Sequence, residues 1–339
     1  MSDLKEMILD LSQSNGTSGD EKKIRSTIKK YLSVLEFKED RNGNLIAVLH
    51  GKGKTFLLDA HCDRIGLTVT HIESNGFLRV AKCGGMDARV LAAQDVTIWG
   101  KEPVYGVITS TPPHLSSSAD EKKAKDFDEI LIDTGLSKEE AEKLISAGDR
   151  ITVKAPALSL MNNRISSPSL DNRAGCATII KAAELVAKKE EHPTVVLLFS
   201  AQEETGGTGA ITGGFDINAD ECISVDVSFA DAPDMPSPTF GKLDGGAMIG
   251  YSPILNREIS EKLKELAIKN NIPHTFEIMN GHTGTNADHI AVLKGGIKTG
   301  LVSIPLRNMH TGVEVISVND VESCAELIAS YILGGGLDA

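Results

Sequence analysis

Two adjacent carboxylates, Glu203 and Glu204, directly follow an apolar run of strand length at residues 195–201 and precede a glycine-rich turn. An acidic side chain at the end of a buried strand is costly unless a metal, a proton or a partner compensates its charge. Because neighbouring side chains in an extended backbone point to opposite sides, one glutamate can bind a metal while the other faces a substrate. The pair alone leaves open which glutamate does which.

Two further acidic motifs lie at predicted strands. His61 and Asp63 follow the strand predicted at 55–60, and their side chains share one face if the strand continues. His61 can then bind a metal while Asp63 orients it, although an apolar strand ending in a polar turn explains this motif equally well. Asp226 interrupts the apolar strand predicted at 222–227, where a charged residue is rarely buried without a partner. A ligand role is therefore favoured for Asp226.

Two more candidate ligands are ambiguous when taken alone. Asp171 precedes a predicted helix at 174–188, where a single Asp is most often an N-cap; the functional alternative is a carboxylate that bridges two cations. His310 follows the apolar run 300–305, where a histidine is more often a hydrogen-bonded structural residue. The five motifs together are far more specific than any one of them.

Two His, two Asp and one Glu form a mixed nitrogen and oxygen set, which suits zinc, cobalt or manganese rather than calcium or a thiolate site. With one bridging carboxylate, the set supplies three ligands to each of two ions and leaves room for a shared water. A two-metal site with ions ~3.5 to 4 Å apart lowers the pKa of that water and stabilises a tetrahedral oxyanion, as amide hydrolysis requires. A neighbouring glutamate would take the proton of the water and pass it to the leaving amine. Glycoside hydrolysis is disfavoured because it uses paired carboxyl groups without two metals.

The composition narrows the class of protein that positions these residues. The chain has 339 residues, enough for two domains, and its 47 acidic and 35 basic residues give a formal charge of -12. This charge disfavours nucleic acid and anionic membranes as partners. No N-terminal leader pattern and no apolar run of bilayer length occurs, so we expect a cytoplasmic protein. The five scattered cysteines predict neither a disulfide framework nor a thiolate zinc site.

The hydrophobic pattern changes twice along the chain. Both ends alternate helical and strand-like segments, which predicts an α/β domain with a mainly parallel sheet flanked by helices, formed by residues 1–65 and 160–339. Short alternating runs between them predict a small β-rich domain inserted at 66–159. Further predictions are a helix at 20–37, a polar surface loop at 111–128, and a closing helix at 318–333 capped by Asn319 or Asp320.

The motifs resemble those of a known family. In chain order they are His61-Cys-Asp-Arg-Ile-Gly, Asp171-Asn-Arg-Ala-Gly, Gln202-Glu-Glu-Thr-Gly, Val225-Asp-Val and Arg307-Asn-Met-His. This order is similar to that of the M42 family of di-metal aminopeptidases, which includes glutamyl and tetrahedral (TET) aminopeptidases. The resemblance implies that His61 and Asp226 bind one metal, that Glu204 and His310 bind the other, and that Asp171 binds both. It also implies that Glu203 is the general base and that Asp63 supports His61.

The same resemblance implies an activity and an assembly. The expected enzyme hydrolyses N-terminal residues from peptides, with a metal-bridging water as nucleophile and Glu203 as base. The expected cofactors are two divalent ions per subunit, zinc or cobalt first and manganese as an alternative. The inserted domain is expected to be a β-barrel or PDZ-like domain used in dimerisation, in a homo-oligomer that builds from dimers up to a dodecamer.

Three places depart from the family pattern near the predicted site. Arg64 stands where family members usually have Glu, Asn286 replaces an acid, and Gly241-Lys-Leu-Asp-Gly-Gly-Ala replaces the usual Leu-Gly-x-Gly-Pro. Arg64, Asn286 and Arg307 are the predicted substrate contacts. Because of the departures, two alternatives stay open: a di-metal deacylase or carboxypeptidase-like hydrolase, and a metal-binding scaffold with little catalysis.

Overall fold

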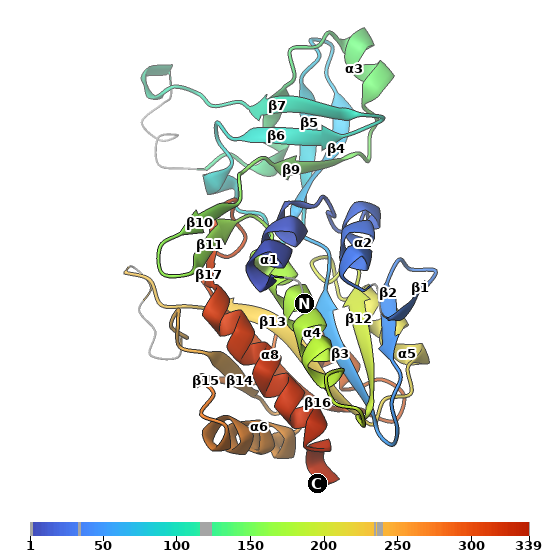
Figure 1. Cartoon of the computed structure of the whole chain (residues 1–339). Helices are drawn as coiled ribbons and strands as arrows, with labels where there is room; N and C mark the ends of the chain where they lie inside the picture. The colour runs from blue at the N-terminus through green and yellow to red at the C-terminus, as the bar shows by residue number, and fades with distance from the viewer. Residues whose placement is uncertain (1–2, 33–34, 116–123, 234, 236–239, 339) are drawn as a thin grey trace.

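The structure is a computed structural model that describes residues 3–32, 35–115, 124–233, 235 and 240–338. Figure 1 shows a large body built around a sheet, with a smaller strand-rich body attached at one end of it. Among the described helices, none combines the length and the apolar character needed to cross a membrane.

An eight-stranded sheet forms the centre of the large body. Its strands, in spatial order, are β1 (Glu36–Glu39), β2 (Leu45–Leu49), β12 (Thr194–Ser200), β3 (Thr55–His61), β13 (Glu221–Phe229), β16 (Lys298–Leu306), β14 (Ala247–Tyr251) and β15 (His274–Ile278). The four central strands β12, β3, β13 and β16 pair in parallel, whereas β1 and β2 are antiparallel at one edge. These central strands are almost wholly buried, as expected for a parallel sheet covered on both faces.

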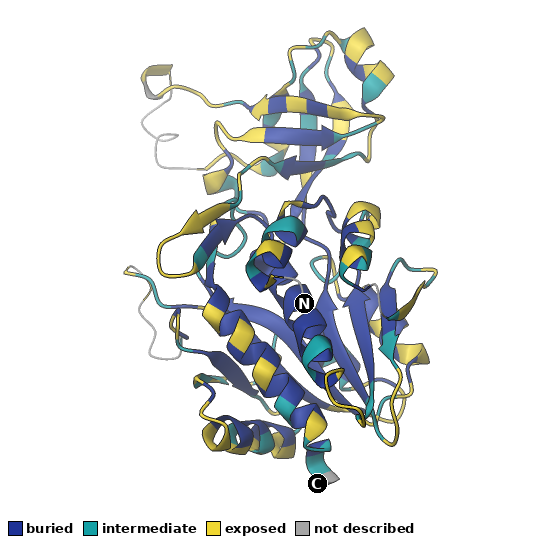
Figure 2. Ribbon diagram, viewed as in Figure 1, coloured by how far each residue is buried: buried dark blue, intermediate teal, exposed yellow. Residues whose placement is uncertain are grey.

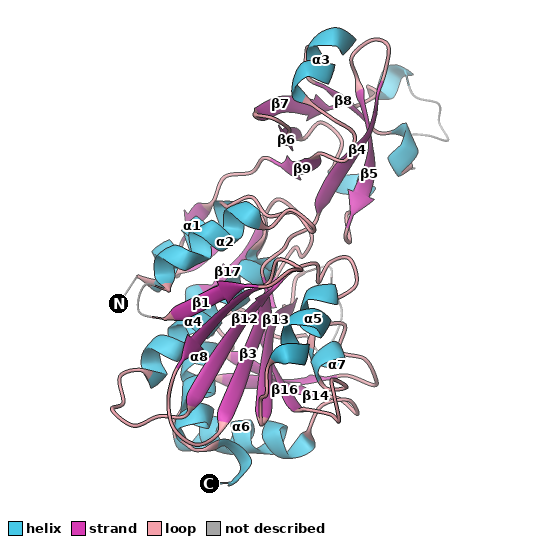
Figure 3. Ribbon diagram, turned by 90° about the vertical axis from the view of Figure 1, so that its right-hand side faces the viewer, coloured by secondary structure: helices cyan, strands magenta, loops and turns pink. Residues whose placement is uncertain are grey.

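Helices cover both faces of the sheet (Figure 3). One face carries α1 (Leu4–Gln13), α2 (Lys22–Ile28), α4 (Leu170–Val186), α6 (Arg257–Lys269) and α8 (Val318–Leu333), whose apolar side chains form the main core with the strands. The other face carries α5 (Thr208–Asp216) and α7 (Ala287–Ile290), which pack on a second cluster that includes Leu57 and Leu198. Figure 2 shows that α8 is buried along the side facing the sheet and exposed on the other side. The apolar stripe therefore determines how this helix docks.

The smaller body is a closed barrel with its own apolar core. Its strands, in order around the barrel, are β4 (Gly66–Ile72), β5 (Leu78–Cys83), β8 (Leu131–Asp133), β7 (Pro103–Ile108), β6 (Asp95–Trp99) and β9 (Arg150–Val153). Side chains along β7 alternate between exposed and buried, so the strand faces the barrel interior on one side only. Ser137 is the N-cap of the helix α3 (Lys138–Leu144) and forms a capping box with Glu140.

The remaining elements are a small sheet and several short 3-10 helices. A three-stranded antiparallel sheet is formed by β10 (Leu158–Leu160), β11 (Arg164–Ser167) and β17 (Glu314–Ser317). Short 3-10 helices are η1 (Lys29–Tyr31), η2 (Ala88–Val90), η3 (Pro113–Leu115), η5 (Phe127–Glu129) and η6 (Gly336–Asp338). The predicted class, an α/β fold with a mainly parallel sheet and a small inserted barrel, is confirmed.

Some local predictions were wrong. The helix predicted at 20–37 ends earlier, because Glu36–Glu39 forms the edge strand β1 against β2. The cap of α8 is Ser317, whose side chain accepts a hydrogen bond from Asn319 N, and not Asn319 or Asp320. For the surface loop predicted at 111–128, the central residues 116–123 lie outside the described residues.

Candidate active site

The candidate ligands meet at the carboxyl edge of the central sheet. His61 is the last residue of β3, Asp226 lies in the second half of β13, and Glu203 and Glu204 follow β12. Parallel neighbouring strands end at the same edge, which is why residues far apart in the sequence converge here. Asp171 joins them from the start of α4, where Ser169, not Asp171, is the N-cap.

His61, Asp171 and Asp226 form one group whose ligand atoms lie close enough to hold a metal ion. His61 Nε2 lies 3.1 Å from Asp171 Oδ1 and 3.7 Å from Asp226 Oδ1. On the opposite side of the ring, His61 Nδ1 lies 3.3 Å from Asp63 Oδ1. A carboxylate at Nδ1 orients the imidazole and leaves the Nε2 lone pair directed at the other two acids.

Asp171, Glu204 and His310 form a second such group. His310 Nε2 lies 3.3 Å from Asp171 Oδ2 and 3.6 Å from Glu204 Oε2. The other ring nitrogen, Nδ1, donates to Gly85 O at 3.1 Å, since a carbonyl oxygen can only accept. The Nε2 lone pair is therefore free for a ligand. Asp171 directs one carboxylate oxygen to each histidine, so it joins the two groups.

The donor set fits two cations of the zinc class. Glu204 Oε1 is buried and has no hydrogen-bond partner among the described residues. Burial, followed by the charge of Asp171, raises the pKa of Glu204 well above its usual value, and burial also raises the pKa of Asp226. Crowded, desolvated carboxylates of this kind are stabilised by a divalent ion, and imidazole with carboxylate donors suits zinc, cobalt or manganese.

Glu203 lies beside both groups without belonging to either. Its Oε2 is 3.9 Å from His61 Nε2, and burial, reinforced by nearby Asp226, raises the pKa of Glu203 to about 8. Asp63 fixes the glutamate pair by accepting hydrogen bonds from Glu203 N at 3.0 Å and from Glu204 N at 3.2 Å. A carboxyl group whose pKa lies near neutrality is suited to proton transfer.

Comparison with known proteins agrees with this geometry. The family model described as M42 glutamyl aminopeptidase matches residues 43–327. The chain belongs to the M42 family. A lysyl aminopeptidase from Pyrococcus furiosus is 33% identical over 334 residues, which cover 96% of each chain. This M42 protein is therefore a peptide hydrolase.

Two solved structures resemble the whole M42 chain. An aminopeptidase from the archaeon Desulfurococcus kamchatkensis has a TM-score of 0.91 at 32% identity, covering 98% of this chain and 94% of that chain. The TET1 peptidase of Pyrococcus horikoshii has a TM-score of 0.87 at 32% identity, covering 98% and 99%. That protein can assemble into a tetrahedron or a large octahedral shell.

Two buried acids of this M42 peptidase escaped the sequence predictions. Glu314 accepts hydrogen bonds from His310 N at 3.0 Å and from Asp171 N at 3.1 Å. Asp59 precedes His61 by two residues on β3 and accepts a hydrogen bond from Ser200 Oγ at 2.8 Å. A signal existed for both, because each is a charged residue within an apolar strand segment, the same pattern that identified Asp226.

The three predicted substrate contacts lie in different surroundings. Asn286 is only 1% exposed, and its Nδ2 donates to Ser200 Oγ at 2.8 Å, so it lies beneath the ligands beside Asp59. Arg307 pairs with Asp231 at 3.1 Å. Arg64 is buried and borders a pocket that also touches His310.

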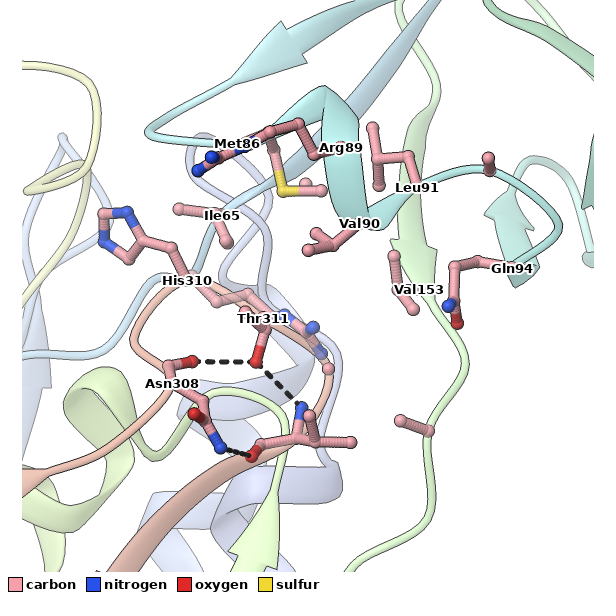
Figure 4. Close-up of a pocket in the computed structure, with 16 residues that line it drawn as sticks. Ile65, Met86, Arg89, Val90, Leu91, Gln94, Val153, Asn308, His310 and Thr311 are labelled. Atoms are coloured by element: carbon pink, nitrogen blue, oxygen red, sulfur yellow. Dashed lines mark hydrogen bonds between the residues drawn. The ribbon is translucent and has the colours of Figure 1, made fainter. Parts of the chain in front are cut away.

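This pocket has a volume of about 540 Å³ and lies between the barrel and the large body (Figure 4). Met86, Val90 and Leu91 form its barrel side, and the loop 308–313 forms the facing wall. The loop is held by its own hydrogen bonds, including one from Thr311 Oγ1 to Asn308 O at 2.7 Å. The residues that line the pocket include no acid, so a bound group would meet apolar side chains, arginine and neutral polar side chains there.

Proposed function

We propose that this M42 peptidase is a di-metal aminopeptidase that removes N-terminal residues from peptides. In this proposal His61 and Asp226 hold one cation, Glu204 and His310 hold the other, and Asp171 is shared. The observation that carries the proposal is the position of Asp171, whose two carboxylate oxygens lie 3.1 and 3.3 Å from the Nε2 atoms of His61 and His310. A carboxylate between two imidazoles is the arrangement expected of a bridging ligand.

The residues of the chain have separate tasks in this reaction. When bound, two divalent cations, zinc or cobalt first and manganese as an alternative, would polarise the scissile carbonyl and lower the pKa of an attacking water. A Glu203 carboxylate oxygen accepts the proton of that water and delivers it to the nitrogen of the leaving amine. Asp63 holds the His61 ring and the backbone of Glu203 in place, which supports a fixed distance between ligand and base.

We also keep the three predicted substrate contacts as part of the proposal. The position of Arg64 beside the pocket near His310 supports a direct contact. The ion pair of Arg307 with Asp231 supports a role in shaping the mouth of the site. The burial of Asn286 supports an indirect effect, through Ser200 and the strand that carries Glu203.

The test is a substrate screen with the zinc- or cobalt-loaded protein. Peptides and aminoacyl-nitroanilides with free N-termini should be cleaved, and their N-acetylated counterparts should not. Glu203→Gln should lower kcat by ~10²- to 10⁴-fold while metal analysis still finds two ions per chain. The exposed Glu190→Gln variant is the matched control and should retain full activity.

Three outcomes would overturn the proposal. Full activity of Glu203→Gln would show that Glu203 is not the general base. Equal cleavage of acetylated peptides would favour a deacylase or a carboxypeptidase-like hydrolase. If the protein binds two ions but turns over no substrate, the result would favour a metal-binding scaffold with little catalysis.

We propose further that copies of the chain associate through the barrel. Tyr105 and Val107 on β7 are exposed apolar residues, which supports an interface on this strand. The assembly of the TET1 peptidase from Pyrococcus horikoshii supports a larger particle. Light scattering that gives the mass of a single chain would contradict this part of the proposal.

A further inference from the structure

One buried carboxylate joins the backbones of two candidate ligands that lie far apart in the sequence. Glu314, at the start of β17, is 1% exposed. Its Oε1 accepts from His310 N at 3.0 Å, and its Oε2 accepts from Asp171 N at 3.1 Å. Each oxygen of a single side chain thus fixes one of the residues that face the second cation position.

The His310 backbone needs such support. His310 lies in the loop between β16 and β17, and its φ of 62° places it in the left-handed region. A residue other than glycine held in a sparsely populated backbone region costs ~1 to 3 kcal/mol, and it persists only when surrounding contacts hold it. The hydrogen bond from His310 N to Glu314 is one such contact, and the bond from His310 Nδ1 to Gly85 O is another.

Asp63 makes backbone contacts of the same kind as Glu314 on the other side of the site. It accepts hydrogen bonds from Glu203 N and Glu204 N while it faces His61 Nδ1. Glu314 has the same relation to Asp171 and His310. Both carboxylates act on ligands through the backbone, and neither belongs to a metal-ligand group of the described residues.

We propose that Glu314 is a positioning residue that holds Asp171 and His310 at the spacing required by the second cation. This inference rests on the proposed function only in taking Asp171, Glu204 and His310 as ligands. Supporting partners of metal ligands contribute ~10- to 100-fold in metal affinity. The loss of zinc affinity should fall mainly on the site formed by Glu204 and His310. On the other side, Asp171 is also held by the contact of its Oδ1 with His61 Nε2.

The experiment measures zinc binding to metal-free protein by calorimetry, without substrate. In Glu314→Ala the weaker of the two zinc affinities should fall by ~10- to 100-fold, while the tighter one changes less. Glu314→Gln keeps one acceptor oxygen and should lose less. The exposed Glu322→Gln variant on α8 is the matched control and should bind zinc as the wild type does.

In kinetics, a positioning role predicts that raised zinc concentration restores kcat in Glu314→Gln. A role confined to fold stability predicts a lower melting temperature with unchanged zinc affinity.

Two results would overturn the inference: unchanged zinc affinities in both Glu314→Ala and Glu314→Gln, or equal losses at both zinc sites. If Glu314→Ala fails to fold, the milder Glu314→Gln variant decides the matter. Failure of the proposed function gives a different result, in which the wild type binds two zinc ions but cleaves no peptide. In that case the zinc titrations still test the role of Glu314.

Discussion

The His61 side of the site is built on strands, whereas the His310 side is built on a loop. His61 ends β3 and is 2% exposed, and Asp226 lies inside β13. The His310 side chain is 32% exposed and extends from a loop with a left-handed backbone at the ligand itself. The two halves of one site are therefore positioned by different means.

The strand side is positioned mainly by the sheet, and Asp63 adds a side-chain contact at His61. Ladder hydrogen bonds and an apolar core fix β3, β12 and β13, and the ligand positions follow from them. The loop side depends on individual side-chain contacts, above all those of Glu314 and of the Gly85 carbonyl. We infer that the strand-side cation is bound more tightly and that the loop-side cation exchanges more readily.

The largest expected effect separates the two sides directly. His61→Ala and His310→Ala should each lower kcat/KM by ~10³-fold, because each removes a ligand worth several kcal/mol of transition-state stabilisation. Metal analysis should differ between them. His310→Ala should keep one ion per chain, whereas His61→Ala should lose the tightly held ion and leave Asp171 without its partner at Oδ1. Two retained ions in His61→Ala, with both lost in His310→Ala, would reverse the comparison.

A smaller effect should come from crowding the loop side without removing a ligand. A Cβ added at Gly85 would lie 2.5 Å from His310 Nδ1 and 2.6 Å from His310 Cε1, so Gly85→Ala must displace the imidazole. We expect a ~10- to 100-fold loss of activity and a weaker second zinc affinity, with little change on the strand side.

Gly281→Ala is the matched control, because nothing lies within 4 Å of a Cβ built there. It should retain wild-type activity. Normal zinc affinity and activity in Gly85→Ala would show that the loop side adapts, and the contrast between strand and loop would then lose its main support.

The same contrast explains how far the sequence predicts the site. Glu203 and His61 lie at the ends of recognisable buried strands and Asp226 lies within one. The cost of buried charge pointed to Glu203 and Asp226, whereas a polar turn explained the His61 motif equally well. Asp171 and His310 were ambiguous alone, since a cap and a structural histidine were the more frequent local explanations. Only the order of the motifs brought them into the set.

Residues that act through long-range contacts were missed. Glu314 matters because the fold brings β17 beside the start of α4, a contact between residues 143 positions apart that no local pattern encodes. The edge strand β1 was missed for a related reason, because its pairing with β2 overrode the helical periodicity that extended into residues 36 and 37. The mainly parallel sheet and a small β-rich inserted domain were predicted from the change in hydrophobic pattern along the chain, whereas the barrel was implied by the family resemblance.

The smallest expected effect is the pH dependence of the stability of the metal-free protein. Titratable groups on both sides of the site change this stability in the same direction. Burial raises the pKa of Glu203 to about 8 on one side and that of Glu314 to about 8 on the other, and the hydrogen bond with Asp171 raises the pKa of His310 to about 9. Each folded pKa lies above the unfolded value, so the folded metal-free protein binds these protons more tightly. The resulting stability is present at low pH and is lost as the pH rises through about 8 to 9.

The melting temperature of the metal-free protein should therefore fall between pH 6 and pH 9, whereas the zinc-loaded protein should change less, because the cations replace the protons as compensating charge. Differential scanning calorimetry of both forms checks this. His310→Gln should flatten the metal-free curve mainly between pH 7 and 9, the range in which the loop-side histidine loses its proton. A metal-free protein that is more stable at pH 9 than at pH 6 would mean that these groups are not held protonated, so protons would not be the compensating charge in the absence of metal.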